Sequence, residues 1–222
     1  MQKAIELGID RVEFDIQETR DGELIIFHDD VIQYQGTRKK VSTFARNELL
    51  QIENKAPDEI PTLESVLDAC RGKIKIQAEL KADGIESQVS TGIVTSGIPV
   101  PDVSISSFNI DRLVLIKSIT SILEDVQLVL LLGKKLAITP ALDEMVAMGI
   151  GSISIFAQDT TSQIVEQIHD RGMRVMAWGL GEKGLKPDNI IKLYRLLLNK
   201  GVDGFTCAYP DMLQRLIRES NS

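Results

Sequence analysis

The sequence from residue 8 reads Gly8-Ile9-Asp10-Arg11-Val12-Glu13-Phe14-Asp15-Ile16. Glu13 and Asp15 lie two residues apart in a strand-like run, so we expect both side chains on one side of the strand. An Asp-Gly turn follows at residues 21–22, and a second apolar run, residues 24–27, ends at His28. At about 3.3 Å per strand residue, Glu13, Asp15 and His28 are expected at neighbouring strand ends. Two carboxylates and one imidazole are the beginning of a metal-assisted hydrolytic site.

Size and charge narrow the class of protein. A chain of 222 residues, 43% of them hydrophobic, can bury one sizeable core, so we expect a single domain over residues 1–222. The net charge of −7 argues against general affinity for nucleic acid or anionic membranes. No apolar run is long enough for a transmembrane segment and no export signal is visible, which favours a cytoplasmic protein. Cys70 and Cys207 are too few for a disulfide framework and are expected as reduced thiols.

Six glycines mark a recurring junction in the sequence. An amphipathic segment ends at each of them, and an apolar or β-branched run follows directly. These are Gly8, Gly72, Gly97, Gly149, Gly172 and Gly201. Glycine suits the left-handed position just past the end of a helix, and the run after it suits a buried parallel strand. The junctions therefore predict repeated helix-to-strand units.

The order of these units predicts the fold class. Strand-like runs lie near residues 11–16, 73–80, 102–107, 126–132, 152–156, 173–178 and 203–206. Helical patterns lie between them, near 62–70, 84–96, 110–122, 138–148, 161–171 and 188–200. This alternation is typical of an α/β fold with a parallel sheet, and seven such strands favour a TIM (β/α) barrel. The run 23–28 follows the first strand without an intervening helix, so it does not fit this alternation and is predicted as a hairpin strand beside the first strand. Residues 30–60 are polar without a clear period and are predicted as an inserted loop over the strand ends.

Further motifs follow in a recognisable order. They are Ile60-Pro61-Thr62-Leu63-Glu64, Ala78-Glu79-Leu80-Lys81, Ser106-Ser107-Phe108-Asn109, Trp178 and Gly201-Val202-Asp203-Gly204-Phe205-Thr206. With the residue 8–22 segment and His28-Asp29-Asp30, they resemble the glycerophosphodiester phosphodiesterase family, a TIM-barrel group of phospholipase-C-like phosphodiesterases, over nearly the whole chain. The resemblance implies hydrolysis of small-molecule glycerophosphodiesters to glycerol phosphate and an alcohol, a reaction of lipid metabolism.

The resemblance also implies a divalent cation, Mg²⁺ or Ca²⁺, held by Glu13, Asp15 and Glu79. Carboxylates suit such a hard cation, and the chain offers no thiolate or multi-histidine set of the kind that zinc prefers. Lys81 shares a strand face with Glu79 and is expected to reach a phosphate oxygen beside the metal. Any one of these carboxylates, taken alone, would be read as a surface group.

The resemblance assigns further roles outside the metal site. His28 would be the acid/base residue, and Trp178 and Phe108 would contact the substrate, although ordinary buried aromatics would give the same pattern. His169 lies at a predicted helix end, where a capping or solvent-facing role is expected.

One family element has no counterpart in the sequence. The family opens with a strand ending in His-Arg-Gly, whose histidine is a second acid/base group and whose arginine binds phosphate. We therefore expect a barrel missing its first strand, with open edges that a homo-oligomer could cover.

Two functions stay open: a phosphodiester hydrolase, or a degenerate barrel that binds metal or phosphate without efficient catalysis. A secreted phospholipase-D-like toxin would need disulfides, and an enolase-type enzyme a lysine base motif, and the sequence shows neither.

Overall fold

The computed structural model describes residues 1–222 except 54, 57, 134–140, 181–186 and 221–222. These residues form two compact units. The N-terminal unit comprises residues 1–107 and 111–126, and the C-terminal unit comprises residues 108–110 and 127–222. The expectation of one domain over the whole chain stays a prediction.

The sheet of the N-terminal unit is built around β1 (Arg11–Glu18). On one side β1 pairs in parallel with β5 (Lys75–Leu80), which pairs in parallel with β6 (Val103–Ser107); on the other side it pairs antiparallel with β2 (Leu24–Ile26). The helices are α1 (Gln2–Glu6), α3 (Leu63–Cys70), α4 (Glu86–Ser96) and α5 (Ile110–Ile119), with short 3₁₀ turns at Val100–Asp102 and Ser121–Leu123. The predicted hairpin strand is confirmed. All five residues of β6 are buried, as expected of a central parallel strand.

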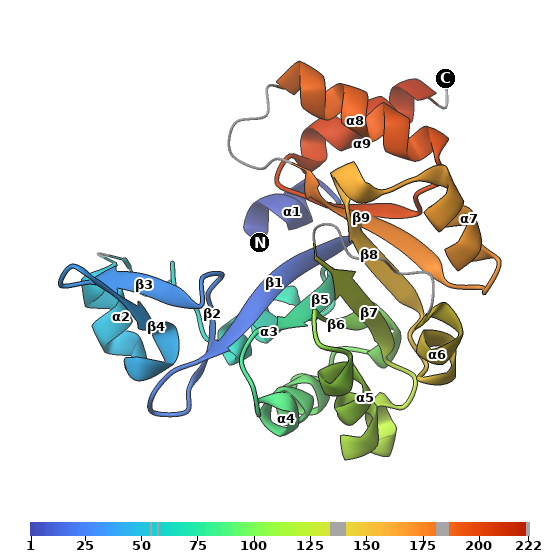
Figure 1. Cartoon of the computed structure of the whole chain (residues 1–222). Helices are drawn as coiled ribbons and strands as arrows, with labels where there is room; N and C mark the ends of the chain where they lie inside the picture. The colour runs from blue at the N-terminus through green and yellow to red at the C-terminus, as the bar shows by residue number, and fades with distance from the viewer. Residues whose placement is uncertain (54, 57, 134–140, 181–186, 221–222) are drawn as a thin grey trace. The chain divides into compact units, whose positions relative to one another are not determined.

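Residues 30–60 are not a structureless loop, so that prediction is wrong. They form an antiparallel hairpin of β3 (Val31–Tyr34) and β4 (Thr37–Lys40), a 3₁₀ turn (Val41–Thr43) and helix α2 (Arg46–Ile52), which lie together in Figure 1. Their buried cluster comprises Ile25, Ile32, Val41, Phe44, Leu49 and Ile60. These apolar residues are irregularly spaced, so no strand or helix period shows in the sequence, and they meet only when hairpin and helix pack together. We call residues 30–60 the insertion.

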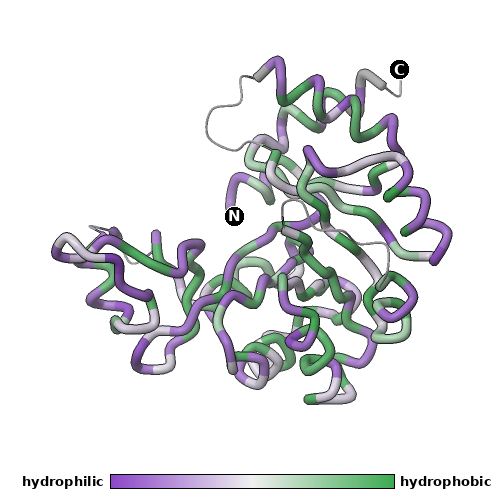
Figure 2. Tube along the Cα trace, in the orientation of Figure 1, coloured by the Kyte–Doolittle hydropathy of each residue, from purple (hydrophilic) through white to green (hydrophobic). Residues whose placement is uncertain are grey.

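The C-terminal unit holds four parallel strands in sequence order. They are β7 (Gln127–Leu132), β8 (Ser152–Phe156), β9 (Arg174–Leu180) and β10 (Gly204–Cys207). The helices are α6 (Leu142–Ala147), α7 (Ser162–His169), α8 (Pro187–Asn199) and α9 (Pro210–Ser220), with a 3₁₀ turn at Ala157–Asp159. Figure 2 shows hydrophilic and hydrophobic residues alternating along α8 and α9, as in amphipathic helices that pack on one side. Helix α9 was not expected from the sequence. The first three residues of the helical pattern at 138–148 lie outside the described residues.

The predicted strand and helix positions are otherwise confirmed, and so is the reason for the glycines. All six junction glycines have positive φ, between 63° and 83°. Parallel pairing is confirmed within each unit, whereas a barrel that lacks its first strand stays a prediction. Both cysteines are free thiols, Cys70 being buried. No helix in the described parts of the chain is long and apolar enough to cross a membrane.

Candidate metal and active site

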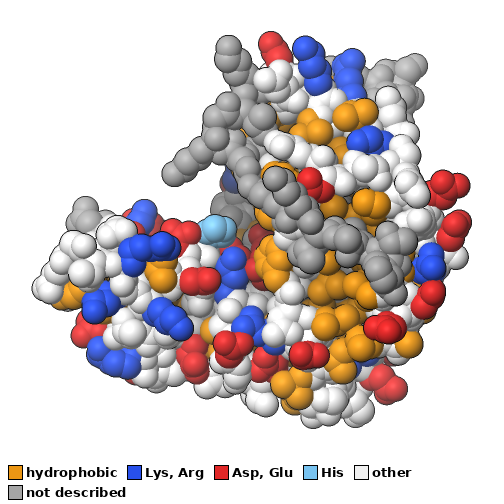
Figure 3. Space-filling view, in the orientation of Figure 1, with side chains coloured by type: hydrophobic (Ala, Val, Ile, Leu, Met, Phe, Trp, Pro, Cys, Tyr) orange, Lys and Arg blue, Asp and Glu red, His pale blue; other side chains and the backbone are white. Residues whose placement is uncertain are grey.

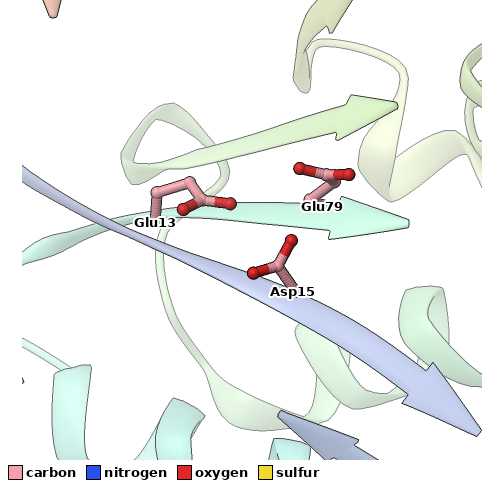
Figure 4. A group of neighbouring side chains, drawn as sticks. All are labelled: Glu13, Asp15 and Glu79. Carbon is pink, nitrogen blue, oxygen red and sulfur yellow. The ribbon is translucent and has the colours of Figure 1, made fainter. Parts of the chain in front are cut away.

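Three carboxylates converge where β1 and β5 run side by side. Asp15 on β1 pairs directly with Glu79 on β5, and Glu13 lies two residues before Asp15. Because alternate residues of a strand share a face, all three side chains project from the same face, while Phe14 between them is buried on the other. The carboxylates point toward one another (Figure 4), and one oxygen from each lies within 4.8 Å of the other two. The three carboxylates that the resemblance names therefore lie together, while their role as cation ligands stays a prediction.

Burial and mutual repulsion make it unfavourable to ionise the carboxyl groups of this cluster. Burial, and then repulsion by Asp15 and Glu79, raises the pKa of Glu13 to about 8, although Lys81 opposes the shift. Burial is also the main reason why the pKa of Glu79 rises to about 7, with Lys81 opposing and Asp15 adding to it. Carboxyls that resist ionisation in this way gain most when a cation binds among them.

Lys81 is the positive charge of the cluster. Its Nζ lies 3.4 Å from Glu79 Oε1 and 3.6 Å from Asp15 Oδ1, and its side chain is 19% exposed. Burial works against the ammonium charge, but the attraction of Glu79 and Asp15 outweighs it and raises the pKa of Lys81 above its ordinary value. Lys81 therefore stays protonated at neutral pH, available to a phosphate oxygen as well as to the carboxylates.

The donor set fits a hard divalent cation. Three carboxylate oxygens within chelating reach suit Mg²⁺ or Ca²⁺. Glu79 Oε1 is buried, and its one polar contact in the part of the chain that the structure describes is the ion pair with Lys81 at 3.4 Å, so it keeps lone pairs for a ligand. One ammonium cannot balance all three carboxyl groups once they are ionised, so their full ionisation leaves net negative charge for a cation to neutralise.

His28 emerges beside this cluster from the end of β2. The backbone N–H of Phe27 donates to Asp15 O at 3.0 Å, and the Gln17 side chain donates to Asp30 Oδ1 at 2.8 Å, so the 27–30 segment is tied to β1 on both sides of His28. His28 Nδ1 lies 2.7 Å from Asp29 Oδ1, and the imidazole is 79% exposed. An ionised carboxylate only accepts, so this contact places the proton on Nδ1 and leaves Nε2 open.

The two predicted aromatic residues touch each other in the C-terminal unit. The rings of Phe108 and Trp178 lie 5.7 Å apart at 84°, and Phe156 packs on Trp178 at 5.1 Å. Trp178 Nε1 donates to Leu132 O at 3.1 Å. Phe108 is 48% exposed, a high value for so large an apolar side chain. Phe108 is therefore accessible to a ligand, while Trp178 is anchored from both sides.

Sequence reasoning missed one arginine that anchors the site. Arg112 Nη1 on α5 donates to the carbonyls of Leu80 and Lys81 at 2.9 and 3.0 Å, and its other end pairs with Asp83. It thus holds the end of β5, from which Lys81 projects. No motif marked Arg112, because the contact spans about thirty residues and depends on how α5 packs.

His169 lies in the last turn of α7, as predicted. Its Nε2 lies 2.8 Å from Asp203 Oδ2, which also accepts the Val175 N–H at 2.7 Å. This is a structural link between the helix end and β9.

Known proteins share this architecture. A sequence profile of the Glycerophosphoryl diester phosphodiesterase family matches residues 1–212. The glycerophosphodiester phosphodiesterase of Caldanaerobacter subterraneus subsp. tengcongensis is 25% identical over 232 residues, which cover 98% of this chain and 90% of that relative.

Solved structures show the same fold. A phosphodiesterase of Oleispira antarctica, in complex with the product sn-glycerol-3-phosphate, matches with a TM-score of 0.75 and 21% identity over 97% of this chain and 88% of its own. The glycerophosphodiester phosphodiesterase of Agrobacterium tumefaciens matches with a TM-score of 0.71 and 20% identity over 96% of this chain and 89% of its own. Because the family profile spans nearly the whole sequence, the chain belongs to the glycerophosphoryl diester phosphodiesterase family, a family of phosphoric diester hydrolases.

Proposed function

We propose that this chain hydrolyses glycerophosphodiesters to glycerol phosphate and an alcohol with the help of a divalent cation, Mg²⁺ or Ca²⁺. The observation that carries the proposal is the convergence of Glu13, Asp15 and Glu79 around Lys81 in a member of this family. The glycerol phosphate product bound to the Oleispira phosphodiesterase supports the substrate class.

The three carboxylates are proposed as the cation ligands. A cation held there would polarise a phosphoryl oxygen and neutralise charge that develops during hydrolysis. Lys81, beside the same carboxylates, would donate to a phosphate oxygen and fix the orientation of the diester. Glu13 and Glu79 would lose the protons that their raised pKa values retain, so cation binding is expected to release protons near neutral pH.

His28 is proposed as the acid/base residue. With its Nδ1 proton held by Asp29, its Nε2 would carry the proton that passes to the oxygen of the leaving alcohol. A positioned group of this kind accelerates a reaction by roughly 10²–10⁴. Asp29 would hold the orientation of the ring.

Phe108 and Trp178 are proposed to contact the carbon skeleton of the substrate. Phe108 offers an exposed apolar ring, and Trp178 backs that ring through their edge contact. Replacing Phe108 by alanine should raise KM with little change in kcat if the contact is one of binding only.

Turnover of glycerophosphocholine, with and without EDTA, tests the proposal. Activity should depend on Mg²⁺ or Ca²⁺, and Glu79→Gln should abolish both activity and cation binding seen by calorimetry. His28→Ala should keep cation binding and lose turnover, whereas His169→Ala, at the end of α7, is the matched control and should keep both. Unchanged turnover in His28→Ala would remove that residue from the chemistry. A chain that binds the cation tightly but hydrolyses nothing would instead be a binding module.

A further inference from the structure

A surface hollow of about 360 Å³ adjoins the carboxylate cluster. Its walls are formed by His28, Asp29, Asp30, Val31, Arg38 and Lys81. Its size is at the lower end of small-ligand pockets. Lys81 belongs both to this hollow and to the carboxylate cluster, so a phosphate held by Lys81 has the hollow next to it.

The register of the insertion hairpin brings Arg38 into this wall. Ile32 on β3 is buried in the insertion's own core, and its cross-strand partner Lys39 shares that face. Arg38, one residue earlier on β4, projects from the opposite face, as does Val31 on β3. The Val41 N–H donates to Asp30 O at 3.0 Å, so the end of β4 is tied to the segment that carries His28.

Among the described residues, some charged side chains of the hollow have hydrogen-bond partners and one does not. Asp29 is bonded to His28, and Asp30 accepts from Gln17. The side chain of Arg38 is exposed and makes neither an ion pair nor a hydrogen bond with any residue in the described part of the chain. Although Asp29 and Asp30 line the same hollow, the Arg38 guanidinium forms no ion pair with either of them. A guanidinium of this kind, in the wall of a ligand-sized hollow, is a receptor for an oxyanion.

The neighbouring lysines have a simpler explanation. Figure 3 shows Lys and Arg side chains gathered over the β3–β4 hairpin. Lys39 and Lys40 are exposed on β4, the edge of a two-stranded sheet, where charge discourages pairing with other chains. Of the three basic residues in succession, Arg38 alone lines the hollow.

The order of groups indicates which part of a substrate meets Arg38. If Lys81 holds the reacting phosphate and His28 protonates the leaving oxygen, the alcohol attached to that oxygen enters the hollow between His28 and Arg38. We propose that Arg38 binds an anionic group, such as a second phosphate, carried by the leaving alcohol, and so selects glycerophosphodiesters that have one. This inference rests on the proposed function and adds the substrate class to it.

A pair of substrates that differ by one phosphate tests the assignment. Kinetics and calorimetric binding are compared for glycerophosphoglycerol and for the same diester with a terminal phosphate on its alcohol, using the parent, Arg38→Gln and the control Lys39→Gln. The parent should have a KM about tenfold lower for the phosphorylated diester, as expected of one partly exposed charge-assisted contact. Arg38→Gln should lose that preference and keep its kcat/KM for glycerophosphoglycerol, and Lys39→Gln should behave as the parent.

Three outcomes would overturn the assignment. The first is that the parent does not prefer the phosphorylated diester, and the second is that Arg38→Gln keeps that preference. The third is that Arg38→Gln weakens the binding of both diesters equally, which would place Arg38 on the reacting phosphate. Failure of the proposed function shows differently, because neither diester would be hydrolysed by any of the three proteins. In that case the calorimetric affinity ratio of the two diesters, in parent and variant, still decides the role of Arg38. Unfolding temperatures of all three proteins verify that the exposed substitutions leave the fold intact.

Discussion

Replacing Glu13 by glutamine should stabilise the metal-free protein at alkaline pH. Glu13 has a pKa of about 8 in the folded chain against an ordinary value of 4.5. Between these pH values the folded state retains a proton that the unfolded state releases, so stability falls as pH rises through the window and the loss is complete above about pH 8. Glutamine has no charge to lose, so Glu13→Gln removes this penalty.

The size of the effect follows from the same shift. At 1.36 kcal/mol per pKa unit the ceiling is about 4 kcal/mol at pH 8, and solvent at the partly exposed Glu13 side chain lowers the expected gain to about 2 kcal/mol. For a chain of this length, that corresponds to an increase in Tm of about 4–8 °C. Near pH 4.5 and below, the difference should vanish.

Thermal unfolding at pH 5 and pH 8.5, in EDTA and then in saturating Mg²⁺ or Ca²⁺, provides the assay. The parent should gain about 2–3 kcal/mol from cation at one hundred times its Kd, whereas Glu13→Gln should gain little. Glu18→Gln removes a carboxylate from the other end of the same strand and should show neither effect. The reasoning is refuted if Glu13→Gln unfolds no higher than the parent at pH 8.5 in EDTA, or if cation stabilises both proteins equally.

Three further perturbations address other parts of the site. Glu13 and Glu79 have pKa values of about 8 and 7, so a cation must displace a proton from each of them at lower pH. Cation affinity measured by calorimetry should therefore fall by up to about a hundredfold per pH unit below pH 7 and level off above pH 8. An affinity that does not change between pH 6 and pH 8 would contradict the ligand assignment. Arg112→Ala should lower the free energy of unfolding by about 2–3 kcal/mol and should also lower kcat, because the carbonyls at the end of β5 lose their donor. Arg112→Lys keeps the charge and should partly restore kcat. Equal kcat in the parent and both variants would show that the end of β5 needs no anchor. Gly179→Ala, within β9, would place a Cβ 2.4 Å from Phe156 at a φ of 80°. It should destabilise the chain by about 1–3 kcal/mol and shift the emission of its only tryptophan, and an unchanged spectrum and Tm would show that the strand adapts.

Local pattern in the sequence accounts for most of the fold. The six junction glycines predicted where helices give way to strands, because only a residue without a Cβ enters the left-handed region at little cost. The two-residue spacing of Glu13 and Asp15 predicted their shared strand face, because side chains alternate along a strand. Both inferences depend on neighbours in the chain, and both are confirmed. The insertion escaped the same reasoning, because its apolar residues follow no single period and make a core only together.

What the sequence determined by itself is therefore which side chains share a strand face and where most strands and helices outside the insertion begin and end; the side chains that carry chemistry stay a prediction. The tertiary structure alone decided their partners: Glu79 opposite Asp15 through the β1–β5 register, Arg112 on the end of β5, and Arg38 in the wall beside Lys81. The direction in which side chains point along a strand or helix depends on residues close in the chain, so it can be read from the sequence. Register between strands and the reach of one side chain to a distant carbonyl depend on how whole elements pack, and no local pattern records that.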